Sequence, residues 1–286
     1  GKNEVVWVEN RLNAPLEVKK AFQFLHSTDP RTKRDEEGYI PSDQLYVLSP
    51  DSQQIMFKKA KRFTRSEMMV MEMLSTNEWK RPFYFAVTIV KDYRLGLDPY
   101  LELTGLAYRI TPERSKNGRP RVNTEVMYDN MLHKFKYGNM NVPGIYIDEN
   151  TMRMCRTHRM MFMELIEALY NEGKHDKCLE VLDFAEAMLP GYNIPYDYTS
   201  ANMASYYYQL GEMDKANAIM TKVADNCAEY MEWGATLTKE LRTSAQSTLQ
   251  HQMAVFSYVL QNFERYQQKE LFNQYYDIYV QYASVR

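Results

Sequence analysis

After Thr151 the sequence repeats apolar residues at helical spacing, and this pattern limits what the second half of the chain can fold into. Two apolar sets lie at i, i+3, i+4 and i+7 on either side of Gly173: Phe162, Leu165, Ile166 and Leu169, then Cys178, Val181, Leu182 and Ala185. A set with this spacing forms one apolar stripe along an α-helix. Because Glu172 and Gly173 interrupt the period, the pattern predicts two antiparallel helices joined by a tight turn.

A second hairpin is predicted around Gly211, which lies 38 positions after Gly173. Residues 171–178 (NEGKHDKC) and 209–216 (QLGEMDKA) align on these glycines and resemble the turn of the tetratricopeptide repeat. In that repeat the glycine permits a tight reversal, and a small residue shortly after it lets the two helices approach. Cys178 and Ala216 occupy that position. The period exceeds the usual length of about 34 residues, and a longer connection over residues 191–195 would absorb the difference.

The match to the repeat weakens toward the C-terminus. Ala185 and Pro190 match the later small residue and the helix-ending proline of the repeat, whereas Val223 and Ala228 do not. A third, degenerate helix pair that would act as a cap is predicted from eight apolar residues: Met253, Phe256, Leu260, Phe263, Leu271, Tyr275, Ile278 and Tyr282. The alternative is an unrelated helical bundle with a chance match at the glycines.

An array of such hairpins presents the side chains of its first helices along a concave groove. The alignment places five residues there as candidate binding residues: Glu167, Tyr170, Asn171, Tyr208 and Gln209. They offer aromatic faces and amides, and they suit a protein or peptide and, as a further option, a glycan. Ordinary hairpin packing is the alternative role for the same residues. Two or three repeats form a short groove, so binding there is expected to be weak.

The first half of the chain mixes helical and strand signals. Thr64 and Glu67 form a capping box at the start of a predicted helix. Residues 83–90 are predicted to form a buried strand, and residues 101–110 another. The predicted fold is therefore an α+β or α/β amino-terminal domain over residues 1–148, followed by an all-α tetratricopeptide-like array of helical hairpins over residues 149–286. Turns at Asn117-Gly118 and Pro143-Gly144 are expected within the first part.

Local signatures of catalysis are missing from the sequence. It contains no H-E-x-x-H, G-x-S-x-G, Walker loop or C-x-x-C motif, so no catalytic residue, metal site or cofactor is predicted. Cys155, Cys178 and Cys227 lack metal-ligand spacing and are expected to be buried. Asp148 and Glu149 are the best carboxylate pair for acid and base chemistry, but a charged helix start explains them as well.

Charge is distributed unevenly along the chain. Residues 161–234 carry 13 acidic and 4 basic side chains, and with +1 over residues 235–286 the net charge of −2 leaves +6 on the first 160 residues. The basic run at residues 114–121 contains no aromatic residue and the run at 58–65 contains only Phe63, unlike the repeated aromatic residues of single-strand binders, so nucleic acid is not expected as a partner. No apolar stretch approaches the roughly 20 residues needed to cross a bilayer.

The segment LSTNEWKRPFYFAVT at residues 74–88 is similar to the extramembrane tail of a Bacteroidetes membrane-protein family, the domain of unknown function 2723. The resemblance continues through residues 26–32, 96–100, 105–109, 123–138 and 146–153. It implies kinship with multi-pass glycosyltransferases of the protein O-mannosyltransferase type, which use lipid-linked sugars. It also implies that this chain is a tail on the extracytoplasmic (periplasmic) side of the inner membrane, preceded by its own membrane domain. In such enzymes the catalytic carboxylate lies between membrane helices, so the resemblance assigns no catalytic residue here.

The main hypothesis is a noncatalytic module that positions a protein acceptor or partner beside a membrane glycosyltransferase, with its basic front half toward anionic headgroups. A second hypothesis is a glycan-binding or glycan-processing domain that uses His26, Trp79 or Asp148. The third is a structural scaffold for oligomer assembly.

Overall fold

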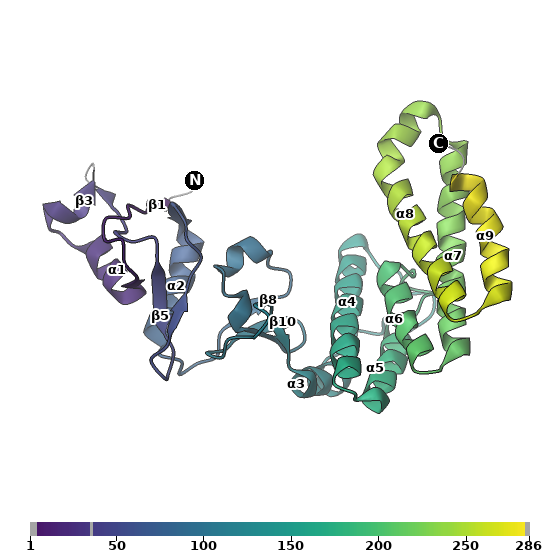
Figure 1. Cartoon of the computed structure of the whole chain (residues 1–286), viewed down its shortest axis with the longest axis horizontal. Coiled ribbons are helices and arrows are strands. Elements are labelled where there is room, and N and C mark those ends of the chain that lie inside the picture. The colour runs from purple at the N-terminus through teal and green to yellow at the C-terminus, as the bar shows by residue number, and fades with distance from the viewer. Residues whose placement is uncertain (1–4, 35–36, 284–286) are drawn as a thin grey trace. The chain divides into compact units, whose positions relative to one another are not determined.

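The computed structural model describes residues 5–34 and 37–283, and the chain divides into two compact units. Unit 1 comprises Gly1–Met127 and unit 2 comprises Tyr128–Arg286. Figure 1 shows unit 1 as small sheets and short helices, and unit 2 as helices packed side by side.

Unit 1 is an α+β domain built from short strands. Its elements in chain order are β1 (Val5–Trp7), β2 (Leu16–Glu17), α1 (Val18–His26), β3 (Lys33–Arg34), β4 (Glu37–Gly38), β5 (Leu45–Leu48), β6 (Gln54–Met56), β7 (Arg62–Thr64), α2 (Arg65–Asn77), β8 (Tyr84–Ala86), β9 (Leu101–Leu103), β10 (Ala107–Ile110), β11 (Arg121–Val122) and α3 (Thr124–Asp129), the last of which runs into unit 2. The strands form four sheets, with orders β1-β7, β2-β5-β6, β3-β4 and β11-β9-β10-β8. Most neighbouring strands are antiparallel, while β2 with β5 and β11 with β9 are parallel.

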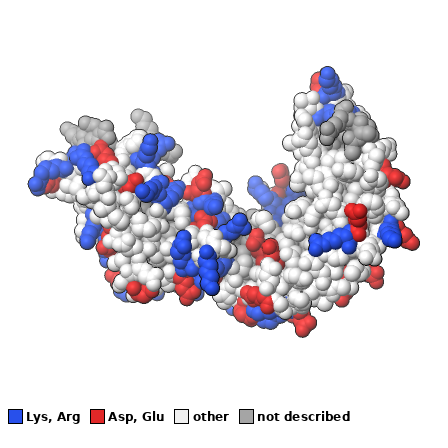
Figure 2. All heavy atoms as spheres, in the orientation of Figure 1, with Lys and Arg blue, Asp and Glu red and all other residues white. Residues whose placement is uncertain are grey.

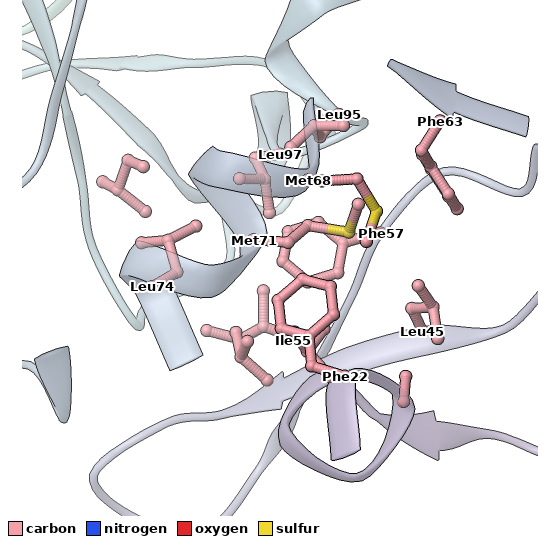
Figure 3. Packing of buried hydrophobic residues seen from close by; sticks show 14 of the residues in the cluster. Phe22, Leu45, Ile55, Phe57, Phe63, Met68, Met71, Leu74, Leu95 and Leu97 are labelled. Carbon is pink, nitrogen blue, oxygen red and sulfur yellow. The ribbon is translucent and has the colours of Figure 1, made fainter. Parts of the chain in front are cut away.

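One apolar core joins α1 and α2 to three of these sheets, those other than β3-β4. Figure 3 shows Phe22 of α1 and Met68, Met71 and Leu74 of α2 converging with strand residues such as Leu45 and Ile55. The segment at Leu95 and Leu97 closes this core, and both side chains are fully buried. Gly96 between them has φ 78°, and a Cβ there would lie 3.1 Å from the backbone nitrogen of Lys58. Only glycine therefore fits this close approach.

The predicted capping box at the start of α2 is confirmed. The Thr64 hydroxyl accepts from the Glu67 backbone N–H at 3.4 Å, and the Glu67 carboxylate accepts from the Thr64 backbone N–H at 2.9 Å. The same carboxylate pairs with the Lys58 ammonium at 2.8 Å, although Glu67 is buried. Burial alone would raise the pKa of Glu67, but the hydrogen bonds from Lys58 and Thr64 outweigh it and lower that pKa.

The prediction of a buried strand over residues 83–90 is wrong. Only β8 forms, over Tyr84–Ala86, and its residues alternate between exposed and buried, with Tyr84 52% exposed. The reason is that successive side chains of a strand point to opposite faces of the sheet: Phe85 packs on the core of unit 1, whereas Tyr84 and Ala86 point to the other face and are exposed. The single strand expected over residues 101–110 is instead a hairpin of β9 and β10.

Unit 2 contains three helical hairpins. They are α4 (Glu149–Asn171) with α5 (His175–Met188), α6 (Tyr198–Gln209) with α7 (Met213–Thr236), and α8 (Lys239–Arg265) with α9 (Lys269–Ala283). The first two corners are Gly173 and Gly211, with φ 73° and 87°, and Cys178 and Ala216 are fully buried behind them. The predicted array of helical hairpins is confirmed, including the third pair. Its assignment to the tetratricopeptide type stays a prediction.

Residues 128–148 pack against the helices of unit 2. The Tyr137 ring lies against those of Phe162 and Phe184, with centroid distances of 5.9 and 5.8 Å. The Asn193 side-chain amide donates to the carbonyls of Met140 and Val142 at 2.8 and 2.7 Å. The division between the compact units therefore falls after Met127. This is earlier than the boundary predicted at residue 148, which lies just before the start of the long helix α4.

The longer connection expected over residues 191–195 lies between α5 and α6, and a buried arginine holds it. The Arg159 guanidinium of α4 is 3% exposed and donates to the carbonyls of Leu189, Ile194 and Pro195 at 3.0, 2.9 and 2.9 Å. It also lies 5.6 Å from the centroid of the Tyr196 ring. One side chain thus satisfies three carbonyls that the end of a helix and an irregular loop leave without backbone partners.

Replacing Glu67 with alanine is expected to destabilise unit 1 by about 2 kcal/mol, since it removes the Lys58 pair and half of the capping box. The pKa of Glu67 is lowered from 4.5, so its contribution is present above that pH and is lost as the pH falls through the lower folded-state pKa. Urea unfolding of wild type and variant at pH 7 and at acidic pH measures both effects. Glu72→Ala on the exposed face of α2 is the matched control and should change little. A stability gap that stays constant from neutral to acidic pH would contradict this account.

Replacing Arg159 with methionine is expected to lower the stability of unit 2 by about 3 kcal/mol, because the buried carbonyls of Leu189 and Ile194 and the partly buried carbonyl of Pro195 lose their donor. Arg159→Lys should recover only part of the loss, since an ammonium lacks the planar fork of five N–H groups. Thermal unfolding monitored by circular dichroism gives the comparison. Arg156→Met, one turn earlier on α4 and exposed, provides the control, and equal losses at the two positions would refute the role given to Arg159.

Candidate binding surface

The structure separates the five predicted groove residues into two groups. Glu167, Asn171 and Gln209 are exposed and Tyr170 is half-buried, so their side chains reach the surface of the first helices. Tyr208 is only 2% exposed. Its ring is not available to a ligand.

Tyr170 links three helices through its ring. It stacks on the His175 ring of α5 at 4.9 Å, nearly parallel at 7°, and meets the Tyr206 ring of α6 edge-on at 5.3 Å. Such aromatic pairs stabilise a fold beyond the area that they bury. Tyr170 therefore presents a ring whose position is fixed on two sides.

Tyr208 has the packing role that was the alternative for this set. Its hydroxyl donates to the Asn217 side-chain oxygen at 2.6 Å, and its ring stacks on Tyr266 at 4.5 Å. Tyr206 is the residue that the sequence alignment missed, because it lies two positions before Tyr208 and on a different side of α6. The signal that could have found it is the run of three tyrosines at residues 206–208, of which a helix can bury only part.

Half-buried and exposed tyrosines from α4, α6 and α8 form one surface, which we call the tyrosine face: Tyr170, Tyr198, Tyr206, Tyr258 and Tyr266. The Tyr198 and Tyr258 rings lie 5.3 Å apart, and the Tyr258 hydroxyl donates to the Asn202 side-chain oxygen at 3.2 Å. These contacts connect α6 to α8, as Tyr170 and Tyr206 connect α4 to α6. All three are the first helices of their hairpins.

The tyrosine face carries few charges, of both signs: Glu164 and Glu167 lie on α4, and the Arg265 guanidinium lies 5.6 Å from the centroid of the Tyr266 ring. Burial and the nearby carboxylate of Glu167 raise the pKa of Tyr206 to about 12, so its phenol stays protonated at neutral pH. Burial raises the pKa of Glu164, and the like charge of Glu167 adds to this effect. Helix α6 has no acidic or basic residue at all. Figure 2 shows wide areas without charged residues over the helices of unit 2 on the face in view.

A small polar pocket lies at the N-terminus of α6, next to Tyr198. It has a volume of about 180 Å³, and its lining includes Arg156 of α4, the N-cap Asp197 and Tyr198 at the start of α6, Tyr230 of α7 and His251 of α8. Helix α6 has 12 residues, whereas α4 has 23 and α8 has 27. The pocket thus extends the tyrosine face with groups that donate and accept hydrogen bonds.

The residues considered for chemistry have structural roles. Asp148 is the N-cap of α4, where its carboxylate accepts from the backbone N–H groups of Asn150 and Thr151 and its pKa is lowered, chiefly by the Thr151 hydroxyl. The Trp79 indole donates to the Leu48 carbonyl at 2.7 Å and packs on the core of unit 1. His26 ends α1.

The structure offers no metal site and no reactive thiol among residues 5–34 and 37–283. No group of three His, Cys, Asp or Glu residues in these ranges is placed to hold a metal ion. Cys155, Cys178 and Cys227 are buried as predicted, and burial raises the pKa of Cys178 to about 11 and that of Cys227 to about 12. Thiols with such pKa values are poor nucleophiles at neutral pH.

A comparison with known protein families matches residues 50–131 to the family described as TMEM260-associated domain 2. The match covers a minority of the chain, from the end of β5 to the start of unit 2, and includes most of the segments that resemble a membrane-protein family. It links the chain to a TMEM260-like membrane protein. It does not support the domain of unknown function 2723 specifically. Neither a curated protein nor a solved structure matches the chain.

Within the described part of the chain, no helix is long and apolar enough to cross a membrane.

Truncating Tyr208 to alanine is expected to destabilise unit 2 by about 3 kcal/mol, as for other large buried aromatic residues. The same change at Tyr206, whose ring is half-buried, should cost clearly less. Urea unfolding of both variants measures the difference. If Tyr206→Ala is as costly as Tyr208→Ala, the tyrosine face is part of the core rather than a surface.

Proposed function

We propose that this chain is a noncatalytic binding module of a multi-pass membrane glycosyltransferase, and that unit 2 positions a protein acceptor or partner through the tyrosine face. The observation that carries this proposal is the tyrosine face itself. It spans the first helices of three successive hairpins and is bordered by Glu164, Glu167 and the pocket at Tyr198. Tyrosines are enriched at interaction surfaces because they combine a large apolar ring with a polar tip.

The family match supports the membrane-protein part of the proposal. It ties residues 50–131 to proteins related to TMEM260, to which O-mannosyltransferase activity is ascribed. The resemblance to the domain of unknown function 2723 leads to the same kind of enzyme and adds the extracytoplasmic, periplasmic location. In this proposal the partners of the chain are its own membrane domain and a protein or peptide acceptor, with the membrane surface nearby.

The chemistry of the tyrosine face suits an extended peptide. Phenol rings provide contact area at low entropic cost, while the side chains of Asn171, Asn202 and Gln209 can pair with a peptide backbone. Glu164 and Glu167 favour a basic residue in the part of the peptide near α4. Three hairpins make a short surface, so the affinity would be low and the module would raise the local concentration of acceptor.

The test is a double substitution, Tyr170→Ser with Tyr206→Ser, in the full-length membrane protein. Each tyrosine removed from the centre of an interface costs roughly 2 kcal/mol or more, so transfer of sugar to protein acceptors should fall about tenfold or further. Sugar transfer to a short synthetic acceptor at saturating concentration should be kept, because the catalytic part is intact. Tyr146→Ser is the control, since Tyr146 is 91% exposed and outside the tyrosine face.

Unchanged transfer by the double variant at equal membrane abundance would reject the proposal. Loss of both activities together with a change in oligomeric state, measured by light scattering, would support the scaffold hypothesis in its place.

A further inference from the structure

A second concave site lies in unit 2 and uses none of the residues of the tyrosine face. It has a volume of about 630 Å³ and is formed by the second helices α5 and α7 together with the connection at residues 190–196. This volume lies in the range of small-molecule sites. The groups that define its chemistry are Asp183, Glu186, Tyr192, Tyr196, Tyr207 and Lys215.

Two carboxylates in this pocket are held in place by tyrosines. Asp183 accepts from the Tyr207 hydroxyl and from the Lys215 ammonium, both at 2.8 Å. Glu186, one turn later on α5, accepts from the Tyr196 hydroxyl. A carboxylate has about four lone-pair positions, so each retains capacity for another donor. Both acceptors are thus oriented before any ligand arrives.

An exposed aromatic ring lies at the edge of the same pocket. Tyr192 is 63% exposed, yet its hydroxyl donates to the Asn141 carbonyl at 2.6 Å. The ring is therefore held at its tip while its face is open to solvent. Pro190, Ala218 and Ile219 add apolar wall nearby. A fixed, uncovered ring beside apolar wall suits a ligand with one apolar face.

The formal charge of the pocket points to a neutral ligand. Asp183 and Glu186 are balanced by Lys215 and Lys222, which also line it. A phosphate would meet two carboxylates, and a basic side chain would meet two ammonium groups. A ligand rich in hydroxyls avoids both conflicts, because a hydroxyl donates to a carboxylate and accepts from an ammonium.

We propose that this pocket binds a neutral carbohydrate, a hexose or a disaccharide. The C–H face of one sugar ring lies on Tyr192, and its hydroxyls donate to Asp183 and Glu186 and accept from Lys215. The site adds glycan recognition to the proposed module and does not depend on it, since it involves a different set of residues.

The test is a titration of the chain with mannobiose, cellobiose and chitobiose up to about 10 mM, a concentration high enough to detect a weak site. Binding is monitored through NMR chemical shifts. At least one disaccharide should bind saturably. Tyr192→Ala and Asp183→Asn should each weaken binding about fivefold or more, whereas Tyr192→Phe, which keeps the ring, should retain most of it. Tyr146→Ala, at another exposed tyrosine, should bind as wild type does. Thermal unfolding of each variant separates a lost contact from a lost fold.

Three outcomes would overturn the proposal. The first is the absence of chemical-shift changes with any disaccharide, and the second is binding by Tyr192→Ala and Asp183→Asn that equals binding by wild type. The third is saturable binding of inositol hexakisphosphate or of an acetylated lysine amide in place of the sugars.

Discussion

The second half of this protein depends on one buried guanidinium. Arg159 reaches from α4 to the carbonyls of Leu189, Ile194 and Pro195, and so holds the connection between α5 and α6. This connection carries Tyr192 and Tyr196 into the pocket between α5 and α7, and its last residue, Asp197, caps the N-terminus of α6. A charge at 3% exposure is costly unless its donors are satisfied. Arg159 therefore stabilises one arrangement of this connection over any looser one.

The first and second helices of a hairpin can present different surfaces because they pack closely at their corner. Gly173 and Gly211 permit the reversal, and the fully buried Cys178 and Ala216 let each second helix lie against its first. With the core filled by these contacts, the remaining faces of the first and second helices can differ in composition. The first helix α6 presents phenols and carries no charged residue, whereas α5 and α7 present the carboxylates of Asp183 and Glu186 and the ammonium groups of Lys215 and Lys222. One small array therefore has two surfaces with different chemistry.

Features set by local sequence could be predicted, and features set by distant partners could not. The capping box of Thr64 and Glu67 and the glycine corners of unit 2 involve residues close in sequence, and both predictions are confirmed. Residues 83–90 have the composition of a buried strand, but burial on both faces depends on distant residues that cover them, and only the face of β8 that carries Phe85 packs on the core. Tyr208 was placed in the groove by alignment, yet the ring of Tyr266, far along the chain, covers it. A helix turns by about 100° per residue, so an assignment that is two positions off exchanges a surface tyrosine for a packing one.

The corner between α8 and α9 differs from the other two in its residue, because a glutamine takes the left-handed position that Gly173 and Gly211 occupy in the first two. Gln267 adopts φ 58° there, a left-handed conformation that costs a side-chain-bearing residue roughly 1 kcal/mol compared with glycine. Helix α9 docks mainly on α7 and α8 and has no further hairpin beyond it among the described residues. Within unit 2 we therefore expect the last hairpin to open locally at the lowest free energy, and amide hydrogens in α9 to exchange with solvent before those of α4 to α7. Because local opening differs along the array, the end at α9 can adapt its shape while the end held by Arg159 stays rigid.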